Sequence, residues 1–325
     1  MKNIYVKDIK AGDKIADTFL VIDKNVAFSQ KGAPYLNLRL RDKTGAIEGR
    51  VWDRALELDR FFKKGDVVYI QSRAASYKNL IQLSIVDIRK ADGAGIDFKE
   101  YAPASKFDIE EMSDSIGKVI AKIQNPHLKK LLDAFFQDEE IVEGFKRAPA
   151  AKGFHHVYAG GLLEHTLSVV RILEHVAEHY GCANQDLLIT GGILHDIGKI
   201  RELSLGPLTE YTDTGRLIGH IVLGVELLDA KIAALDGFPE QLAIELRHII
   251  LSHHGILEYG SPKRPKTIEA LMIHYVDDMD AKVNAFQGFI ENANGNESDW
   301  TPFHRLFERF IYKGKNPVPS EEQNG

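Results

Sequence analysis

The chain contains a single cysteine, Cys182, among its 325 residues. One cysteine cannot form an internal disulfide, and it has no second thiolate with which to build a cysteine-rich metal site. The chain also lacks any run of the roughly 18 apolar residues that would indicate a membrane span. Its first residues, MKNIYVKDIK, lack the apolar core of a secretory signal. We therefore predict a cytoplasmic protein without membrane association, in which any metal is bound by histidine and carboxylate.

Charge is distributed unevenly along the chain. Residues 1–90 contain 18 Lys and Arg against 11 Asp and Glu, a balance of +7. The remaining residues contain 23 against 36, a balance of −13. A basic module is typical of proteins that bind a polyanion, although lysine and arginine also keep small domains soluble. The charge alone leaves both interpretations open.

The first 90 residues alternate apolar and polar side chains with period two, which is the pattern of β-strands. We predict five strands, over residues 14–28, 35–41, 46–52, 66–76 and 80–89, with a short helix over residues 56–62. In the second strand leucine alternates with polar residues from Leu36 to Arg41, so one face is apolar and the other is cationic. Five strands with one helix between them indicate a small barrel.

The segment GAPYLNLRLRDKTGAIEGRVWD, residues 32–53, resembles the strand, turn, strand segment of the OB-fold family. That resemblance implies binding of a nucleic-acid single strand, with bases stacked on aromatic rings and phosphates held by basic side chains. Some of the aromatic side chains could instead belong to the barrel core. The residues expected to bind nucleic acid are Tyr35, Arg39, Arg41, Trp52 and Arg73.

Beyond the barrel, residues 91–110 form a joint rich in Gly, Ala and Pro, after which the apolar spacing becomes that of helices. We predict an all-helical domain over residues 111–315 and a flexible polar tail over residues 316–325. The expected fold class is therefore two-domain, with a small all-β OB-fold barrel over residues 1–90 followed by an all-α domain.

His195 and Asp196 interrupt an apolar stretch, LLITGGIL before them and IGKI after them, that otherwise has the composition of a core helix. Burial of an imidazole and a carboxylate is costly unless something pairs with them. Hydrogen bonds within the core could satisfy one such pair. Further apolar segments, however, carry His165, His220, His253 with His254, and Asp277. A common metal centre explains all of these residues more economically than separate exceptions do.

The motifs HDIGK at residues 195–199 and YVDDMDAK at residues 275–282, within this ordered set, resemble the HD superfamily of metal-dependent phosphohydrolases. The resemblance spans about residues 150–290 and identifies the helical domain as an HD domain. It implies one metal ion held by His165, His195, Asp196 and Asp277. It implies a second ion held by Asp196, by His220, and by His253, His254 or both. Asp196 would bridge the two ions as a catalytic residue.

The chemistry of these donors fits that interpretation. Imidazole and carboxylate suit two divalent ions, and this chemistry alone leaves manganese, iron, cobalt, nickel and zinc open. Two ions about 3.5 to 4 Å apart can lower the pKa of a bridging water and stabilise charge on the attacking and leaving oxygens of a phosphodiester. Lys199, three residues after Asp196, could neutralise a nonbridging phosphate oxygen as a second catalytic residue, or could be an exposed lysine at a helix end. His274 could support Asp277 or simply pack beside it.

An OB-fold followed by an HD domain resembles the YhaM family of bacterial 3'-to-5' exoribonucleases, and the likeness covers nearly the whole chain. The matching segments include HVYAGGLLEHTLSVV, LHDIGK, LIGHI, LSHHG and HYVDDMDAK. The resemblance implies metal-dependent exonucleolytic hydrolysis of single-stranded RNA, and of single-stranded DNA as a second substrate, to nucleoside monophosphates. An assembly of several identical subunits would suit such an enzyme.

Other functions remain open at this point. One is an HD phosphohydrolase acting on small nucleotides, against which the basic barrel argues. Another is a cyclic-dinucleotide phosphodiesterase, but ILEYGSP after His254-Gly255 lacks the Gly-Tyr-Pro extension of that subgroup. A noncatalytic single-strand-binding protein is the third, and the complete set of candidate ligands argues against it.

Overall fold

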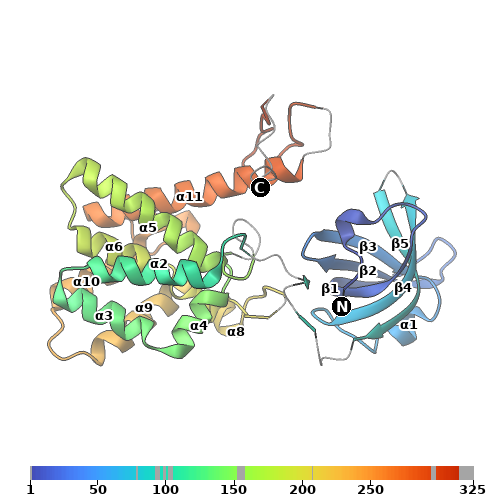
Figure 1. Cartoon of the computed structure of the whole chain (residues 1–325), viewed down its shortest axis with the longest axis horizontal. Coiled ribbons are helices and arrows are strands. Elements are labelled where there is room, and N and C mark those ends of the chain that lie inside the picture. Colours follow the sequence, from blue (N-terminus) through green and yellow to red (C-terminus); the bar gives the residue numbers. More distant parts are fainter. Residues whose placement is uncertain are drawn as a thin grey trace.

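The computed structural model has two units, a β-barrel at the N-terminal end and a helical domain (Figure 1). It describes residues 2–77, 80–91, 96–97, 100–101, 105–151, 158–206, 208–293 and 298–314. The predicted tail over residues 316–325 lies outside the described residues, as do positions 92–95, 98–99 and 102–104 of the predicted joint. Within the described ranges, no helix is long and apolar enough to cross a membrane.

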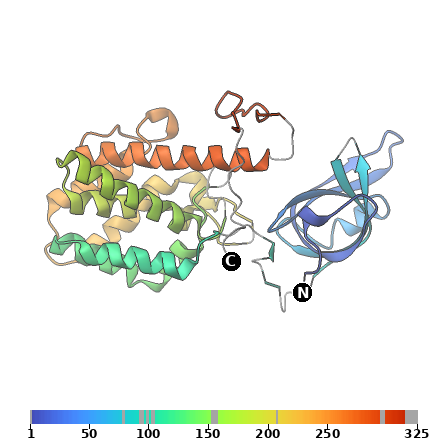
Figure 2. The same cartoon turned by 45° about the horizontal axis from the view of Figure 1, so that its top comes forward.

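The N-terminal unit is a closed barrel of five strands in the order β1-β2-β3-β5-β4 (Figure 2). Neighbouring strands are antiparallel, except for the parallel pair β3 and β5. The five strands begin and end within one residue of their predicted positions. Their bounds are β1 (Lys14–Phe28), β2 (Pro34–Asp42), β3 (Gly45–Val51), β4 (Val67–Tyr77) and β5 (Leu80–Lys90). Two short helices accompany them, a 3-10 helix at Val6–Asp8 and α1 (Ala55–Leu58).

The predicted alternation sets the two faces of the barrel wall. Leu36, Leu38 and Leu40 of β2 are fully buried in the barrel interior, while Arg39 between them is exposed. Phe19 from β1 and Ile70 from β4 complete the same apolar core. Because side chains alternate across a strand, the polar residues between these core positions form the outer surface.

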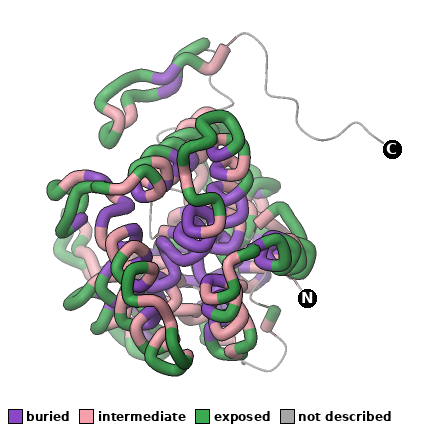
Figure 3. Tube along the Cα trace, turned by 90° about the vertical axis from the view of Figure 1, so that its left-hand side faces the viewer, coloured by how far each residue is buried: buried purple, intermediate pink, exposed green. Residues whose placement is uncertain are grey.

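The second unit consists of helices. The long ones are α2 (Ile109–Lys122), α3 (Pro126–Phe136), α4 (Glu139–Arg147), α5 (Gly161–Tyr180), α6 (Gln185–Leu194), α9 (His220–Ala233), α10 (Glu240–Ser252) and α11 (Ile268–Asn292). Two short helices, α7 (Lys199–Glu202) and α8 (Asp213–Leu217), connect α6 to α9. The buried residues lie inside this bundle (Figure 3), and its apolar core includes Leu128, Leu188, Ile193 and Ile273.

The helix expected through His195 and Asp196 is interrupted. α6 ends at Leu194, and residues 195–198 form a turn before α7 begins at Lys199. α9 packs closely against this turn, since a Cβ on Gly198 would lie 2.0 Å from the backbone oxygen of His220. Lys199 is the first residue of this second, short helix.

The two units touch through the loop between α7 and α8. Leu208 of this loop packs against a small apolar cluster on the barrel that contains Leu20, Val67 and Tyr101. Lys64 of the barrel forms an ion pair with Glu210 of the loop, with Nζ and Oε1 2.6 Å apart. One loop of the helical domain thus joins the barrel by both an apolar and an ionic contact.

Candidate metal centre

The predicted ligands meet because several helix ends converge. His165 lies in the first two turns of α5 and His220 begins α9, while His195 and His253 directly follow the ends of α6 and α10. Asp277 projects from the middle of α11. The residues His165, His195, Asp196 and His253 are at most 1% exposed.

The first group of donors contains His165, His195, Asp196 and Asp277, whose ligand atoms all lie within 4.8 Å of one another. His165 Nε2 lies 3.1 Å from Asp277 Oδ1 and 3.6 Å from Asp196 Oδ2. His195 Nε2 lies 3.4 Å from the same Asp196 oxygen. This is the set that the sequence predicts for one ion.

The second group contains Asp196, His220, His253 and His254. The Nε2 atoms of His220 and His253 each lie 3.5 Å from Asp196 Oδ1. These two nitrogens and that oxygen are buried, and none has a hydrogen-bond partner among the described residues. Burying three converging donor atoms is energetically costly unless something binds them. They fit a divalent cation, and the sequence alternative of ordinary core hydrogen bonds does not account for them.

Asp196 is shared by the two groups. Its Oδ2 faces His165 and His195, whereas its Oδ1 faces His220 and His253. Lys199 Nζ also forms an ion pair with Oδ2. Burial raises the pKa of Asp196, but the charges of Lys199 and His195 outweigh this effect and hold the pKa well below its ordinary range. The carboxylate is therefore ionised and available to two cations at once.

All five histidines are oriented in the same way. Each uses Nδ1 as a donor to a carboxylate or carbonyl oxygen, which leaves the Nε2 lone pair of the neutral ring for a metal ion. The acceptors are Asp280 for His165, Gly192 for His195, Glu202 for His220, Ile250 for His253 and Tyr259 for His254, at 2.7 to 3.0 Å.

The pKa of three of these histidines is displaced, and burial lowers that of His253. Burial would lower the pKa of His165, but hydrogen bonds to Asp277 and Asp280 raise it to about 9. Burial and the neighbouring His253 and His220 lower the pKa of His254 to about 3. The His254 ring is therefore neutral at pH 7, whereas a metal ion would have to displace a proton from His165.

Two positioning residues were not predicted. Asp280 orients His165, and its other oxygen accepts a hydrogen bond from Ser168. Glu202 accepts from both the backbone N–H and Nδ1 of His220 through one oxygen, at 3.0 Å each. Asp280 lies one helical turn after Asp277, which is a signal that the sequence does contain. Glu202 offers no such signal, because its contact with His220 depends on how α7 packs against α9.

His274 supports the centre from the other side. Its Nδ1 donates to the backbone oxygen of His253 at 2.9 Å. Gly255 follows the two histidines with φ +77°, and a Cβ there would lie 2.1 Å from the ring of His274. Only glycine fits this turn, and His274 thus holds the segment that presents His253 and His254 rather than acting on Asp277.

We expect Glu202→Gln to lower the affinity for the second ion and to leave the affinity for the first unchanged. The substitution keeps the size of the side chain but removes the charge that orients His220, and the loss of such a partner typically lowers metal affinity by about tenfold to 100-fold. Calorimetric titration with Mn²⁺ should show one weakened and one unchanged site. Glu226→Gln, an exposed carboxylate on the same helix α9, is the matched control. Equal weakening of both sites would contradict the assignment.

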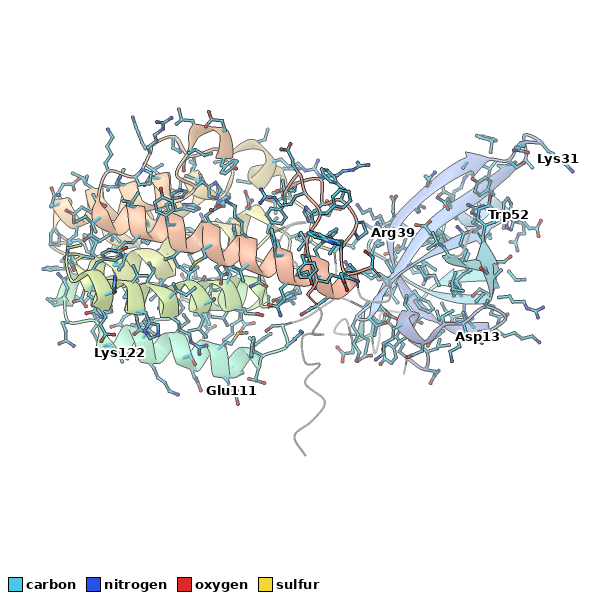
Figure 4. All side chains as sticks on the ribbon, turned by 90° about the horizontal axis from the view of Figure 1, so that it is seen from above. Asp13, Lys31, Arg39, Trp52, Glu111 and Lys122 are labelled. Atoms are coloured by element: carbon cyan, nitrogen blue, oxygen red, sulfur yellow. The ribbon has the colours of Figure 1, made fainter. Side chains whose placement is uncertain are left out.

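The residues predicted to bind nucleic acid lie at different places on the barrel. Tyr35 and Trp52 lie together, with ring centroids 4.8 Å apart. Arg39 stands between Asp23 and Glu48 in the cross-strand register, and it lies on the side of the barrel nearer the helical domain (Figure 4). Trp52 lies farther from that domain (Figure 4).

The remaining predicted arginines differ in exposure. Arg41 is half-buried and donates to the backbone oxygen of Tyr101 at 3.3 Å, whereas Arg73 is exposed on β4. Arg50 has its guanidinium 5.7 to 5.8 Å from the ring centroids of Tyr35, Trp52 and Tyr77. It also belongs to one register row with Ser84, Arg73 and Lys14.

The comparisons with known proteins agree with this geometry. The family model "HD domain" matches residues 162–282, a span that contains every donor of both groups. The second OB-fold domain of replication protein A from Methanococcus maripaludis is 18% identical, with a TM-score of 0.24, over 28% of this chain and 96% of that chain. The strand order, not this weak likeness, supports the barrel assignment.

Curated relatives match nearly the whole chain. A protein of Listeria monocytogenes serotype 4b named "3'-5' exoribonuclease YhaM" is 36% identical over 296 residues, covering 89% of this chain and 92% of the relative. The protein of the same name from Bacillus subtilis is 34% identical over 309 residues, covering 94% and 96%. That from Shouchella clausii is 33% identical, covering 90% and 91%.

Proposed function

Because the chain belongs to the YhaM family of 3'-5' exoribonucleases, we propose that it hydrolyses single-stranded RNA from the 3' end and releases nucleoside monophosphates. The observation that supports this most strongly is the pair of buried donor groups that share Asp196. Single-stranded DNA has the same phosphodiester bond and is the second substrate that we propose. We propose manganese as the metal. Imidazole and carboxylate donors suit it, and they also suit cobalt, iron, nickel and zinc. An RNA substrate also fits the predicted cytoplasmic location.

His165, His195 and Asp277 would hold one ion, His220, His253 and His254 the other, and Asp196 both. Two ions so held would supply an activated water and offset charge on the phosphodiester. Asp196 fixes the centre through its two oxygens. Lys199, which is 8% exposed and paired with Asp196, is the catalytic cation that we place beside a nonbridging phosphate oxygen.

We interpret the barrel as an OB-fold that holds the strand. Its five-stranded closed topology fits that fold. Trp52 and Tyr77 are about half exposed, and with Tyr35 they surround Arg50, so bases have aromatic faces on which to stack beside a cation. Arg39 and Arg73 would contact phosphates elsewhere on the barrel. Arg41, tied to Tyr101, is the weakest of the predicted contacts.

The test is incubation of the full chain with 5'-labelled single-stranded RNA in Mn²⁺. We expect a ladder that shortens from the 3' end, with nucleoside monophosphates as product. Parallel assays with a 3'-phosphorylated RNA and with a 5'-phosphorylated RNA report the direction of hydrolysis. Turnover of mononucleotides or cyclic dinucleotides with RNA left intact would refute the nuclease and favour the small-nucleotide alternative. Binding of RNA without any hydrolysis in all five metals would favour the noncatalytic alternative.

A further inference from the structure

A cavity of about 450 Å³ lies where the barrel meets the loop between α7 and α8. We call it the seam pocket. The barrel contributes the loop before β4, and the helical domain contributes the loop after α7 together with α8. Its lining residues are Lys63, Lys64, Gly65, Asp66, Leu208, Glu210 and Arg216. None of these residues belongs to the donor groups of the metal centre.

The seam pocket is structurally connected to the metal centre. Arg216 precedes the ligand His220 by four residues, and its neighbour Gly215 packs so tightly on Glu202 that a Cβ would lie 2.2 Å from the Glu202 backbone oxygen. Glu202 in turn binds His220 through both the backbone N–H and Nδ1. Arg216 is therefore held at a fixed place relative to the second donor group.

The charge of the pocket suits a polyanion. Lys64 is paired with Glu210, and Asp66 is paired with Lys90. Lys63 and Arg216 are exposed, and within the described part of the chain neither side chain has an ion-pair partner. The lining carries three basic and two acidic side chains, so its charge balance is positive by one, although residues 91–325 carry a net charge of −13. Lys63 on the barrel and Arg216 on the helical domain therefore favour an anionic ligand.

We propose that the seam pocket is a subsite for the phosphodiester backbone, which a strand occupies between the barrel and the metal centre. Lys63 and Arg216 each contact a phosphate there. This inference rests on the proposed function and identifies how the strand travels between the two units. Helix α8, which carries Arg216, lies at the end of the helical domain that faces the barrel (Figure 1).

The test compares Lys63→Gln, Arg216→Gln and the double variant with Lys130→Gln. Lys130 is an exposed lysine on α3, away from the barrel, and its variant has the same change of charge. Fluorescence anisotropy in Ca²⁺ measures binding of a 20-nucleotide single strand at several salt concentrations. We expect about threefold to tenfold weaker binding for each seam variant, and a slope of log K against log salt that falls by about 0.7 per lost contact. The affinity for RNA and the affinity for DNA should fall equally, because the proposed contact is to phosphate.

Hydrolysis provides the second readout. The seam variants should raise KM for the 20-nucleotide RNA without changing kcat, and should leave cleavage of a dinucleotide unchanged, because a dinucleotide does not reach the pocket. Binding and salt slope equal to those of Lys130→Gln would overturn the inference. Slower dinucleotide cleavage would also overturn it, since Arg216 would then act through the metal centre. A failed nuclease assay is distinguishable, because the anisotropy measurement requires no hydrolysis.

Discussion

Asp196→Asn should abolish hydrolysis while leaving a folded protein. The asparagine side chain has nearly the same shape, but it cannot offer an anionic oxygen to each of two cations. Loss of both ions would remove several kcal/mol of transition-state stabilisation, and about 4 kcal/mol corresponds to about a 10³-fold slower reaction. The rate of 3'-end shortening of labelled RNA measures the effect, and near-UV circular dichroism checks the fold.

The matched control is Asp278→Asn. Asp278 adjoins Asp277 on α11, but it lies outside both donor groups and forms an exposed pair with Lys282. Pairs of this kind contribute little to stability, so activity should stay within about twofold of the wild type. If both variants lost activity equally, the effect would be a general consequence of altering this region and not of losing the shared ligand.

Metal content distinguishes a shared ligand from an ordinary one. Asp277 touches only the first donor group, so Asp277→Asn should retain about one ion per chain. Asp196→Asn should retain fewer than that, against two for the wild type. Elemental analysis after gel filtration gives these numbers directly. Equal metal content in the two variants would contradict the bridging role of Asp196.

Local patterns explain why so much of the fold could be predicted. Alternation at Leu36, Leu38 and Leu40 is a property of neighbouring residues, and these leucines are buried as expected. The family resemblance, carried by motifs such as LHDIGK, is confirmed by relatives that match along nearly the whole chain. Both features can be recognised without knowing which elements touch.

What the sequence could not predict depends on contacts between distant segments. The close approach of α9 to Gly198 joins segments that are apart in the sequence, and the contact of Glu202 with His220 depends on the same packing. Arg41 and Arg50 both lie on predicted strands, yet closure of the barrel places one beside the backbone of Tyr101 and the other among three aromatic rings. Neither outcome follows from a strand pattern.

Removal of the metal ions should destabilise the helical domain and leave the barrel unaffected. Each ion present at about 100 times its Kd would raise the free energy of unfolding by about 2.7 kcal/mol, which for a domain of about 200 residues corresponds to a Tm difference of about 5 to 10 °C per ion. Differential scanning calorimetry with EDTA and after Mn²⁺ reloading measures this shift. The barrel transition is the internal control, because the donor groups lie entirely in the helical domain. An EDTA-insensitive Tm would argue against bound metal.

The pH dependence of that shift follows from His165. In the metal-free protein its ring donates to Asp280 through Nδ1, and its Nε2 lies 3.1 Å from Asp277, so the protonated form is favoured and the pKa rises from 6.5 to about 9. This raised pKa stabilises the metal-free fold fully below pH 6.5, and the contribution is lost as the pH rises through about 9. A metal ion must displace the same proton, so its apparent affinity increases over that interval. The Tm difference between loaded and EDTA-treated protein should therefore widen from pH 6.5 to pH 9, and a difference that narrowed would contradict the role of His165 as a ligand.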